Sequence, residues 1–361
     1  MIAISGGNGF LGKHCKIFCK MNKLEDVVFI DRKNFKDKQI VKKLNSCKYF
    51  IHLADINRSN KSLTQINFKT LKYYFDTLKN NKNLKKIIYT SSIHRNLNND
   101  YGRSKRKNEK ELKLFCKMKK IDHKIIILGN IFGEFCRPNY NSVVATICND
   151  LIKNKKFDLK KNRKLRLVYA QDAIKYIFKT IKTDSKINSL KYNSISVLNL
   201  YKKLLDFKEN YFNHSIPNFK NIFDLNLFNT LRSYAFPTKI KLNTKDHIDN
   251  RGNLWEVIKA KNKAQIFLST TKKNKVRGNH FHTKKIERFI VLQGSALIKF
   301  RYIFEKKIHK FLVKAKDKQC IDIPTYCTHN LTNNSNKNLL TLFFTNEIYN
   351  PHKPDTYYEK V

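Results

Sequence analysis

The chain has 361 residues, of which 41% are hydrophobic and 12% aromatic. This length predicts two domains, because a domain usually has about 150 residues, and the apolar content excludes a disordered or fibrous chain. Lysine and arginine number 74 against 28 acidic residues, which gives a net charge of +46. Because the lysines are scattered along the whole chain, without interleaved aromatics or a nucleic-acid-binding motif, we expect no nucleic-acid partner.

Targeting signals and cysteine pairs are not evident in the sequence. No apolar run approaches the roughly 18 residues of a membrane-spanning helix, and the chain opens on a strand-like run without a preceding signal segment. The eight cysteines form no Cys-x-x-Cys pair, which argues against a zinc ribbon or a redox dithiol. We therefore expect a cytoplasmic protein with reduced thiols and no membrane span.

The first half of the chain alternates strand-like and helix-like segments. Runs rich in β-branched residues predict strands at residues 2–5, 27–31, 48–54, 85–91 and 124–129. Amphipathic segments lie between these runs. The alternation predicts a Rossmann-type α/β domain, in which a parallel sheet carries helices on both faces.

A glycine-rich loop follows the first predicted strand, and we expect a helix to open at Lys13. Glycines three residues apart let the backbone turn tightly and approach a pyrophosphate, while the helix N-terminus directs its amides at the phosphates. The loop therefore predicts a dinucleotide site. Its predicted cofactor-binding residues are Gly6, Gly9, Phe10, Leu11 and Gly12.

The second predicted strand ends in Asp31, followed by Arg32 and Lys33, where the adenosine ribose of the cofactor should lie. Asp31 could accept a hydrogen bond from a free 2′-hydroxyl, which favours NAD, or it could be only a turn residue. Arg32 and Lys33 could bind a 2′-phosphate. Two cations outweigh one anion, so we expect NADPH.

A serine at a strand end and a Tyr-x-x-x-Lys pair form the strongest catalytic pattern. Ser92 ends the fourth predicted strand, and Tyr101 and Lys105 lie four residues apart at the start of a predicted helix. Such spacing puts both side chains on one helix face, where the ammonium can acidify the phenol and hold a ribose. Tyr101 could then protonate a carbonyl oxygen while Ser92 donates a hydrogen bond to it and a nicotinamide supplies hydride.

These motifs resemble the extended short-chain dehydrogenase/reductase family, which acts mostly on nucleotide sugars. Leu53 and Ala54 match its segment along the nicotinamide, and Asn67 matches an asparagine on its next helix. Residues 130–133 resemble its substrate-contacting Asn-x-Tyr-Gly stretch, so the resemblance implies substrate binding by Asn130.

The chain also departs from that family at two places. The family's arginine three residues before Asn130 is Ile127 here, so we expect substrate phosphate binding by Arg137 or a lysine. Dehydratases of the family carry an Asp-Glu pair after the catalytic hydroxyl residue, where this chain has Ile93 and His94. Dehydration is thus disfavoured, which leaves a 4-epimerase or a keto-sugar reductase.

The second half of the chain contains only short strand-like runs and predicts an all-β sandwich or barrel. A polar stretch at 238–246 separates the halves, and we expect domains at 1–243 and 244–361. The predicted strands of the second domain span residues 254–258, 264–269, 288–294, 296–304, 320–325 and 338–346.

Three histidines and one glutamate of this second domain have metal-ligand spacing. His280 and His282 alternate along a strand, Glu287 begins the next strand, and His329 follows later. Imidazole and carboxylate groups suit a borderline-hard divalent metal. We expect zinc at this site, with iron, manganese and nickel as alternatives.

The spacing of these four residues resembles the two motifs of the cupin superfamily, which implies a cupin β-barrel. Asn274 and Tyr326 stand where the two motifs usually have glycine. Asparagine tolerates left-handed backbone. Tyr326 is less easily accommodated, and we interpret it as an acid/base group at the barrel mouth. Cys327 beside the predicted ligands reads as a small buried hydrophobe rather than a ligand or nucleophile.

Over nearly its entire length the chain resembles the CapF-type enzymes of capsular polysaccharide biosynthesis. The stretches that carry this resemblance are 136–146, 249–259, 277–302, 323–330 and 346–361. The resemblance implies a UDP-2-acetamido-2,6-dideoxy-hexos-4-ulose substrate on the way to UDP-N-acetyl-L-fucosamine. It further implies that the cupin epimerises carbon 3 and that the first domain then reduces the 4-keto group with NADPH.

That division of labour is chemically sensible, because a 4-keto group acidifies the proton on carbon 3 and a metal ion can stabilise the resulting negative charge. The alternative is an NAD-dependent nucleotide-sugar 4-epimerase with a non-catalytic, sugar-binding or dimerising cupin. In either case we expect a homodimer.

Overall fold

The computed structural model describes residues 1–159, 161–182, 190–243, 246–249, 252–255, 258–260, 264–347, 350, 352 and 354–361. Its contacts divide the chain into two compact units. Unit 1 contains residues 1–143 and 163–196, and unit 2 contains residues 144–162 and 197–361. The boundary predicted at 243/244 stays a prediction.

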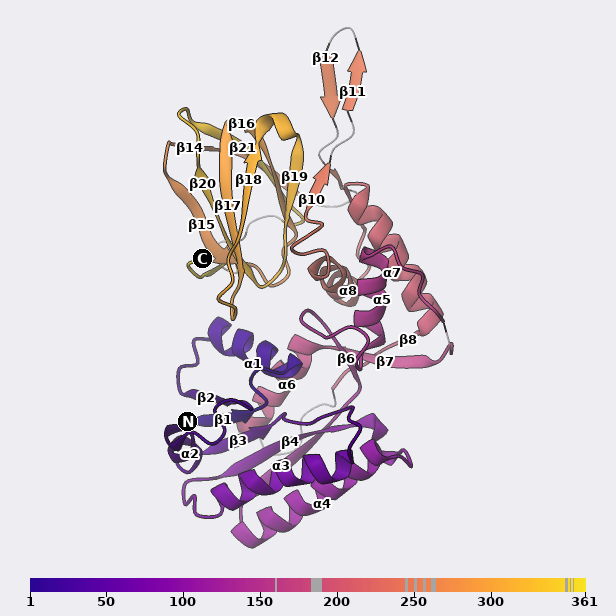
Figure 1. The fold of residues 1–361 in the computed structure, drawn as a ribbon, viewed down its shortest axis with the longest axis vertical. Helices are drawn as coiled ribbons and strands as arrows, with labels where there is room; N and C mark the ends of the chain where they lie inside the picture. Colours follow the sequence, from indigo (N-terminus) through magenta and orange to yellow (C-terminus); the bar gives the residue numbers. More distant parts are fainter. Residues whose placement is uncertain are drawn as a thin grey trace. The chain divides into compact units, whose positions relative to one another are not determined.

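Unit 1 is built on a five-stranded parallel sheet, ordered β2-β1-β3-β4-β5 (Figure 1). All five predicted strands are present, with ends moved by at most two residues. The strands are β1 (Ile2–Ser5), β2 (Val27–Ile30), β3 (Tyr49–His52), β4 (Lys86–Ser92) and β5 (Asp122–Leu128). Their apolar runs are continuous because helices cover both faces, as predicted.

Two helices cover one face of this sheet and three cover the other (Figure 1). The first pair is α1 (Phe10–Met21) and α6 (Ala170–Lys182), and the second group is α2 (Lys38–Leu44), α3 (Leu63–Leu78) and α4 (Asp100–Lys119). The expected start of α1 at Lys13 is wrong. The helix begins at Phe10, because Gly9 already has the extended backbone of an N-cap residue.

A short three-stranded sheet completes unit 1, with β6 (Asn130–Phe132) parallel to β7 (Lys164–Tyr169) and β8 (Asn193–Ser196) antiparallel to β7. The helix α5 (Val143–Ile152) leads from unit 1 into unit 2.

Unit 2 contains an all-antiparallel barrel of two five-stranded sheets, as the sequence predicts. The sheet orders are β10-β19-β16-β21-β14 and β18-β17-β20-β15-β22. The strands are β10 (Lys241–Asn243), β14 (Gln265–Thr271), β15 (Val276–Phe281), β16 (Glu287–Gln293), β17 (Ser295–Tyr302), β18 (His309–Lys314), β19 (Gln319–Ile323), β20 (Cys327–Asn333), β21 (Leu339–Thr345) and β22 (Tyr357–Tyr358).

The strand predicted at 254–258 lies partly outside the described residues. Residues 254 and 255 belong to β12 (Gly252–Trp255), which pairs with β11 (Asp246–Asp249), and residue 258 lies outside a strand. The sequence does not predict β18, whose Lys310 and Lys314 flank the apolar residues. Such lysines are typical of an edge strand, and β18 is indeed at the edge of its sheet.

Unit 2 also contains the helices α7 (Val197–Phe212) and α8 (Ile222–Ser233). A buried ion network joins α8 to the barrel. Between them lies β9 (Ser215–Ile216), which pairs with β13 (Lys259–Ala260). Arg232 of α8 donates to both carboxylate oxygens of Asp322 on β19, and Arg288 of β16 donates to the same carboxylate at 3.0 Å. All three side chains are at most 1% exposed, so two buried guanidinium ions share one carboxylate as their counter-ion.

We expect Asp322→Asn to lower the free energy of unfolding by about 3–5 kcal/mol, because removing one member of a buried ion network leaves its partners buried without a counter-ion. Urea denaturation followed by circular dichroism measures this loss. Lys203→Ala is the matched control, since Lys203 is partly exposed in its 2.9 Å pair with Asp224 and should contribute at most about 1 kcal/mol. Equal destabilisation by the two variants would contradict the prediction.

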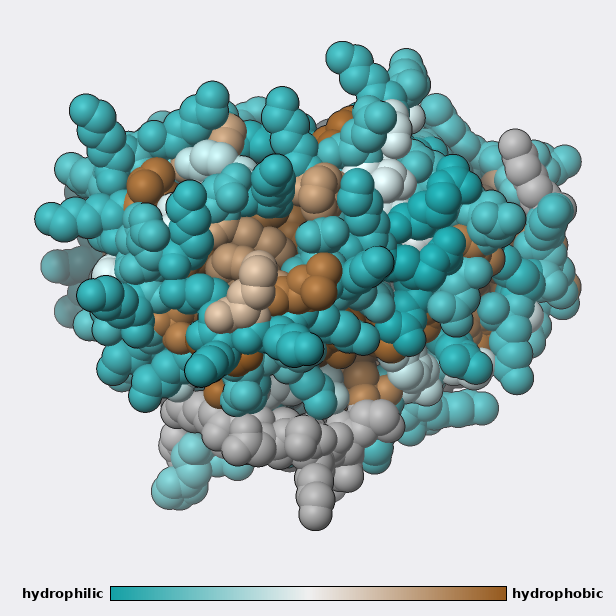
Figure 2. Space-filling view, turned by 90° about the horizontal axis from the view of Figure 1, so that it is seen from below, coloured by the Kyte–Doolittle hydropathy of each residue, from teal (hydrophilic) through white to brown (hydrophobic). Residues whose placement is uncertain are grey.

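Hydrophilic side chains cover most of the face shown in Figure 2, and hydrophobic ones occupy limited areas among them. Within the part of the chain that the structure describes, no helix is both long and apolar enough to cross a membrane.

Candidate functional site

The glycine loop joins β1 to α1 and has the tight geometry that its sequence predicts. Gly6 has a φ of +78°, a left-handed conformation that favours glycine. A Cβ atom on Gly12 would lie 2.2 Å from the carbonyl oxygen of Gly6, so the first turn of α1 can approach the loop only without a side chain there. Phe10 and Leu11 occupy that first turn. This cradle at a helix N-terminus fits the pyrophosphate of a dinucleotide.

Asp31 follows β2 and is occupied by local contacts. Its carboxylate accepts hydrogen bonds from the backbone amides of Lys33 and Asn34, at 2.7 and 3.2 Å, and from the side chain of Asn8 in the glycine loop. Arg32 and Lys33 are exposed beside it. The Asp31 carboxylate therefore stabilises the turn after β2 and the glycine loop, as a turn residue would. Arg32 and Lys33 remain the two exposed cations beside the loop.

Leu53 and Ala54 follow β3 and border the glycine loop. Their amides lie 3.2 and 3.4 Å from the hydroxyl of Ser5, which accepts hydrogen bonds from both. A Cβ atom on Gly6 would lie 3.0 Å from the nitrogen of Ala54. The ends of β1 and β3 are thus held together, as expected at the carboxyl edge of a parallel sheet where a dinucleotide binds.

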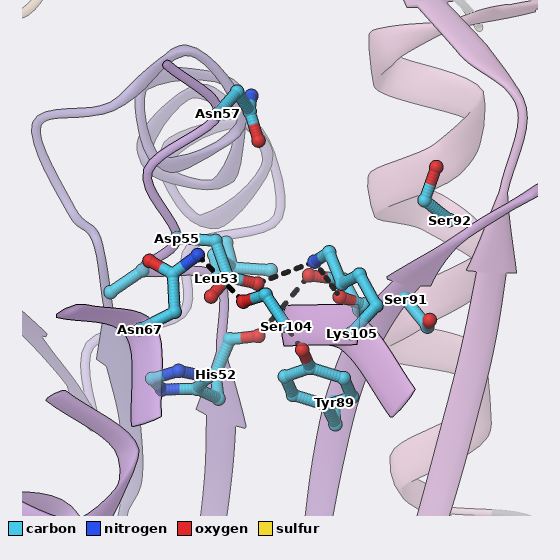
Figure 3. Close-up of polar contacts among 12 residues, drawn as sticks. His52, Leu53, Asp55, Asn57, Asn67, Tyr89, Ser91, Ser92, Ser104 and Lys105 are labelled. Atoms are coloured by element: carbon cyan, nitrogen blue, oxygen red, sulfur yellow. Dashed lines mark hydrogen bonds and ion pairs between the residues drawn. The ribbon is translucent and has the colours of Figure 1, made fainter. Parts of the chain in front are cut away.

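Lys105 lies on the first turns of α4, where it is held by a buried carboxylate (Figure 3). Its ammonium forms an ion pair with Asp55 and donates to the carbonyl oxygen of Thr90 at 2.9 Å. Burial opposes the charged form of Lys105, but the Asp55 carboxylate together with Tyr89 and Tyr101 raises the pKa of the ammonium. The Tyr89 hydroxyl also donates to Asp55, at 3.3 Å. Lys105 is therefore a fixed cation.

Tyr101 and Ser92 lie on neighbouring elements. Tyr101 is one turn before Lys105 on α4, and the Lys105 ammonium lies 5.8 Å from the centroid of the Tyr101 ring. Ser92 ends β4, and its hydroxyl accepts from the amide of His94 at 3.1 Å, which begins the short 3₁₀ turn Ile93–Asn96. The structure thus brings Tyr101 and Lys105 together, as their spacing predicts.

Asn67 on α3 ties the segment after β3 to α4. Its side chain makes hydrogen bonds with the amide and carbonyl of Ile56, at 2.8 and 3.0 Å, and donates to the hydroxyl of Ser104 at 3.0 Å (Figure 3). This residue positions the Asp55 segment beside Lys105.

The predicted substrate-binding residues lie on and after β6. Asn130 begins β6, and Arg137 is an exposed residue of the following loop. The Arg137 guanidinium lies 5.5 Å from the Tyr140 ring centroid, and that of Arg58 lies 6.0 Å from it. Arg58 also donates to the carbonyl oxygen of Asn139 at 3.2 Å. Two guanidinium groups thus share one tyrosine, which is a suitable arrangement for an anionic diphosphate.

The four predicted metal ligands of the barrel converge in the structure. The ligand atoms of His280, His282, Glu287 and His329 all lie within 4.8 Å of one another. His280 is the last residue but one of β15 with His282 just beyond the strand, Glu287 begins β16, and His329 lies on β20. Nε2 of His282 and Nε2 of His329 lie 2.6 and 3.8 Å from the same Glu287 carboxylate oxygen.

The electrostatics of this cluster suit a divalent cation. Burial lowers the pKa of His280 to about 4 and that of His329 to about 3, which keeps both imidazoles neutral. Burial alone would raise the pKa of Glu287, but His282 and the other histidines lower it to about 2. Burial opposes charge on His282 as well, but its partners Glu287 and Asp355 raise its pKa. Metal ligands need neutral imidazoles and an ionised carboxylate, so His280, His329 and Glu287 already have the required states, and His282 has it once its ring is deprotonated. The donor set therefore fits a metal ion.

Asn274 and Tyr326 both have a φ of +59°, so the two positions where cupin motifs usually carry glycine keep the left-handed backbone here. This conformation is mild for asparagine and unusual for a bulky residue. Tyr326 is 1% exposed, and its amide donates to the carbonyl oxygen of His282 at 2.8 Å. Tyr326 is thus joined to a predicted ligand, while its role as an acid/base group stays a prediction. Cys327 is buried in the apolar core of the barrel.

Three residues near the predicted sites are not predicted from the sequence. They are Asp55, which pairs with Lys105, Arg58, which joins Arg137 at Tyr140, and Asp355, whose backbone oxygen accepts from Nδ1 of His282. The basic or acidic character of each was visible in the sequence, but their partners lie far away along the chain.

The first part of the chain combines a Rossmann-type sheet with a glycine loop and a Tyr-Lys pair on one helix. The second part is an antiparallel barrel with a cluster of His and Glu residues. Together they define a two-part nicotinamide-dependent enzyme. The chain belongs to the NAD-dependent epimerase/dehydratase family, whose model matches residues 2–193. Residues 247–357 match the model of the polysaccharide biosynthesis C-terminal domain.

Full-length relatives share both parts. The UDP-2-acetamido-2,6-beta-L-arabino-hexul-4-ose reductase of Pseudomonas aeruginosa is 27% identical, over 99% of this chain and 97% of its own length. The crystal structure of the capsular polysaccharide assembling protein CapF from Staphylococcus aureus is similar with a TM-score of 0.63 and 28% identity, over 100% of both chains. The resemblance to CapF-type enzymes is thereby confirmed.

A third similarity concerns the fold alone. The UDP-N-acetylglucosamine 4-epimerase of Methanobrevibacter ruminantium matches with a TM-score of 0.53 and 19% identity, over 64% of this chain and 97% of its own. The family model makes the chain an enzyme of the NAD(P)-dependent epimerase/reductase type.

Proposed function

We propose that the chain is a bifunctional enzyme of surface polysaccharide synthesis. Its barrel epimerises carbon 3 of a UDP-2-acetamido-2,6-dideoxy-hexos-4-ulose, and unit 1 then reduces the 4-keto group with NADPH, toward UDP-N-acetyl-L-fucosamine. The observation that carries this proposal is the convergence of His280, His282, Glu287 and His329 in the barrel of a chain that also carries Tyr101 and Lys105 on one helix. Full-length similarity to a UDP-sugar reductase supports it.

In the proposed reduction, Tyr101 protonates the carbonyl oxygen on carbon 4. Lys105 is held as a cation by Asp55 close to the Tyr101 ring, which favours loss of the phenolic proton. Ser92 donates a hydrogen bond to the same carbonyl oxygen. The bound nicotinamide, held by the glycine loop with Leu53 and Ala54, would supply the hydride to carbon 4.

In the proposed epimerisation, the phenolate of Tyr326 takes the proton from carbon 3, and a water molecule delivers a proton to the opposite face of the same carbon. His280, His282, Glu287 and His329 would hold a divalent metal, zinc in our proposal, which supplies Lewis acidity for the negative charge on the carbonyl oxygen. Three of these four residues are buried, so a cation held there would stabilise negative charge more strongly than it does in water.

The UDP group of the substrate is proposed to bind at the loop after β6. Asn130 contacts the sugar, and Arg137 together with Arg58 binds the diphosphate, since guanidinium groups pair with phosphate oxygens in a bidentate manner.

The proposal places this reaction in the cytoplasm, because all eight cysteines are free thiols, as expected in a reducing compartment. The expected homodimer stays a prediction.

Incubation with the UDP-4-keto sugar in deuterium oxide, with and without NADPH, tests this function. We expect one deuterium at carbon 3 without NADPH, and one NADPH oxidised per sugar reduced when it is added. The alternative, an NAD-dependent 4-epimerase with a non-catalytic cupin, would interconvert 4-epimers with no net NADPH consumption and no exchange at carbon 3.

We expect NADPH to give a kcat/KM at least about tenfold above that of NADH, because a charge-assisted hydrogen bond to the 2′-phosphate contributes about 1.5–3 kcal/mol. The double variant Arg32→Ala/Lys33→Ala should lose this preference, measured as the ratio of the two values. Lys36→Ala, which removes a nearby cation whose ammonium lies over Phe35, is the control and should keep it. A higher efficiency with NADH would mean that Asp31 governs the site.

A further inference from the structure

The C-terminal segment, residues 354–361, contacts the predicted metal cluster through one of its ligands. The carbonyl oxygen of Asp355 accepts a hydrogen bond from Nδ1 of His282 at 2.6 Å. The other ring nitrogen, Nε2, lies 2.6 Å from the carboxylate of Glu287, and the His282 residue is 2% exposed. The ring is therefore held at both nitrogens, and the tail carbonyl determines which nitrogen faces the other ligands.

The Asp355 side chain holds the backbone that joins two of the ligands. Its carboxylate accepts hydrogen bonds from the amides of Thr283, Lys284 and Lys285, at 2.7 to 3.1 Å, and from the Thr283 hydroxyl at 2.6 Å. These three residues directly follow His282, and a single residue, Ile286, separates them from Glu287. One aspartate thus fixes both the ring of a ligand and the turn that sets the separation of two ligands.

The rest of the segment lies along the strand that carries His280. In β22, Tyr358 pairs with His280 and Tyr357 with Phe281 of β15, and the rings of Tyr357 and Phe281 stack with centroids 5.2 Å apart. Glu359 continues this attachment through an ion pair with Arg301 at 3.1 Å. The segment is therefore anchored directly after the point where Asp355 meets His282.

We propose that Asp355 is a positioning residue of the metal centre, and that the C-terminal segment acts through it to hold the ligand His282 in place. The proposal rests on the metal site of the proposed function. A hydrogen-bonded partner on the second ring nitrogen fixes the tautomer and the direction of a ligating histidine, and losing such a partner typically weakens metal binding by about 10–100-fold. Asp355 supplies that partner with its carbonyl and holds it in place with its carboxylate.

The test uses the full-length chain and Zn²⁺, with affinity measured by competition against a chromophoric chelator. We expect Asp355→Ala to weaken Zn²⁺ binding by about 10–100-fold and to change the visible spectrum of the Co²⁺-loaded protein. Asp355→Asn keeps one acceptor oxygen and should restore part of the affinity. Glu359→Ala is the matched control, because it removes an anchor of the same segment that does not touch a ligand, and its affinity should stay within about twofold of wild type.

Folding is followed separately by circular dichroism, and Thr283→Val gives a second variant that removes one hydrogen bond to Asp355 with little change in shape. This variant should weaken Zn²⁺ binding less than Asp355→Ala does, and should add nothing when combined with it. Wild-type affinity in a folded Asp355→Ala protein, or an equal loss in Glu359→Ala, would overturn the positioning role alone. A wild-type chain that binds no divalent metal would overturn the metal site itself and this proposal with it.

Discussion

Tyr101→Phe is expected to slow reduction of the 4-keto group by about two to four orders of magnitude, the usual contribution of a positioned acid. The reason is that the substituted side chain keeps an aromatic ring beside Lys105, whose ammonium lies 5.8 Å from the Tyr101 ring centroid, but has no proton for the carbonyl oxygen. NADPH oxidation in the presence of keto sugar measures the loss. Cofactor binding, measured by nucleotide fluorescence titration, should change little.

The matched control for this variant is Tyr73→Phe, which removes a hydroxyl from α3 that donates to the carbonyl oxygen of Phe35 at 2.7 Å. It should reduce the sugar at close to the wild-type rate. If Tyr101→Phe also oxidises NADPH at nearly the wild-type rate, the acid is another group and the assignment of Tyr101 fails.

His280→Ala is expected to remove the metal and to stop solvent deuterium from entering carbon 3, while unit 1 still oxidises NADPH on the keto sugar that it accepts. The loss follows because His280 is one of four ligands whose donor atoms lie within 4.8 Å, and a buried site with three donors holds a divalent ion much less tightly. Metal content is measured by atomic emission, and exchange by mass spectrometry in deuterium oxide.

His309→Ala is the control for this experiment, since His309 lies on β18 of the same barrel with its ring against Phe236. It should keep both metal and exchange. Deuterium incorporation at the wild-type rate in a metal-free His280→Ala protein would mean that the site is structural. Chelation that lowers the unfolding temperature without changing the exchange rate per molecule would indicate the same.

Much of the first domain could be predicted from local patterns. Local patterns predict the strands of the parallel sheet, the glycine loop, and the position of Tyr101 one helical turn from Lys105, because each depends on residues a few positions apart. The structure contains all three features. The start of α1 differs because a helix boundary depends on one N-cap residue, here Gly9. Residues at element ends are the least determined by periodicity.

The spacing of the metal ligands in the barrel could be predicted from the sequence, but the backbone conformation next to them could not. The alternation of His280 and His282 before Glu287 indicates one cluster, because successive side chains two apart share a face. The left-handed backbone at Tyr326 was not predictable from residue type, since tyrosine rarely adopts it without neighbouring strands that impose it.

The class of fold, the dinucleotide loop and the four candidate metal ligands could be predicted from the sequence, because they depend on short-range spacing and on side-chain chemistry. The long-range contacts emerge only from the packing of the fold: the Asp55 carboxylate meets Lys105, 50 residues away, the backbone carbonyl of Asp355 meets His282, 73 away, and Arg232 meets Asp322, 90 away. A buried charge requires a partner, but which partner it finds depends on how strands and helices pack, and no local pattern carries that information.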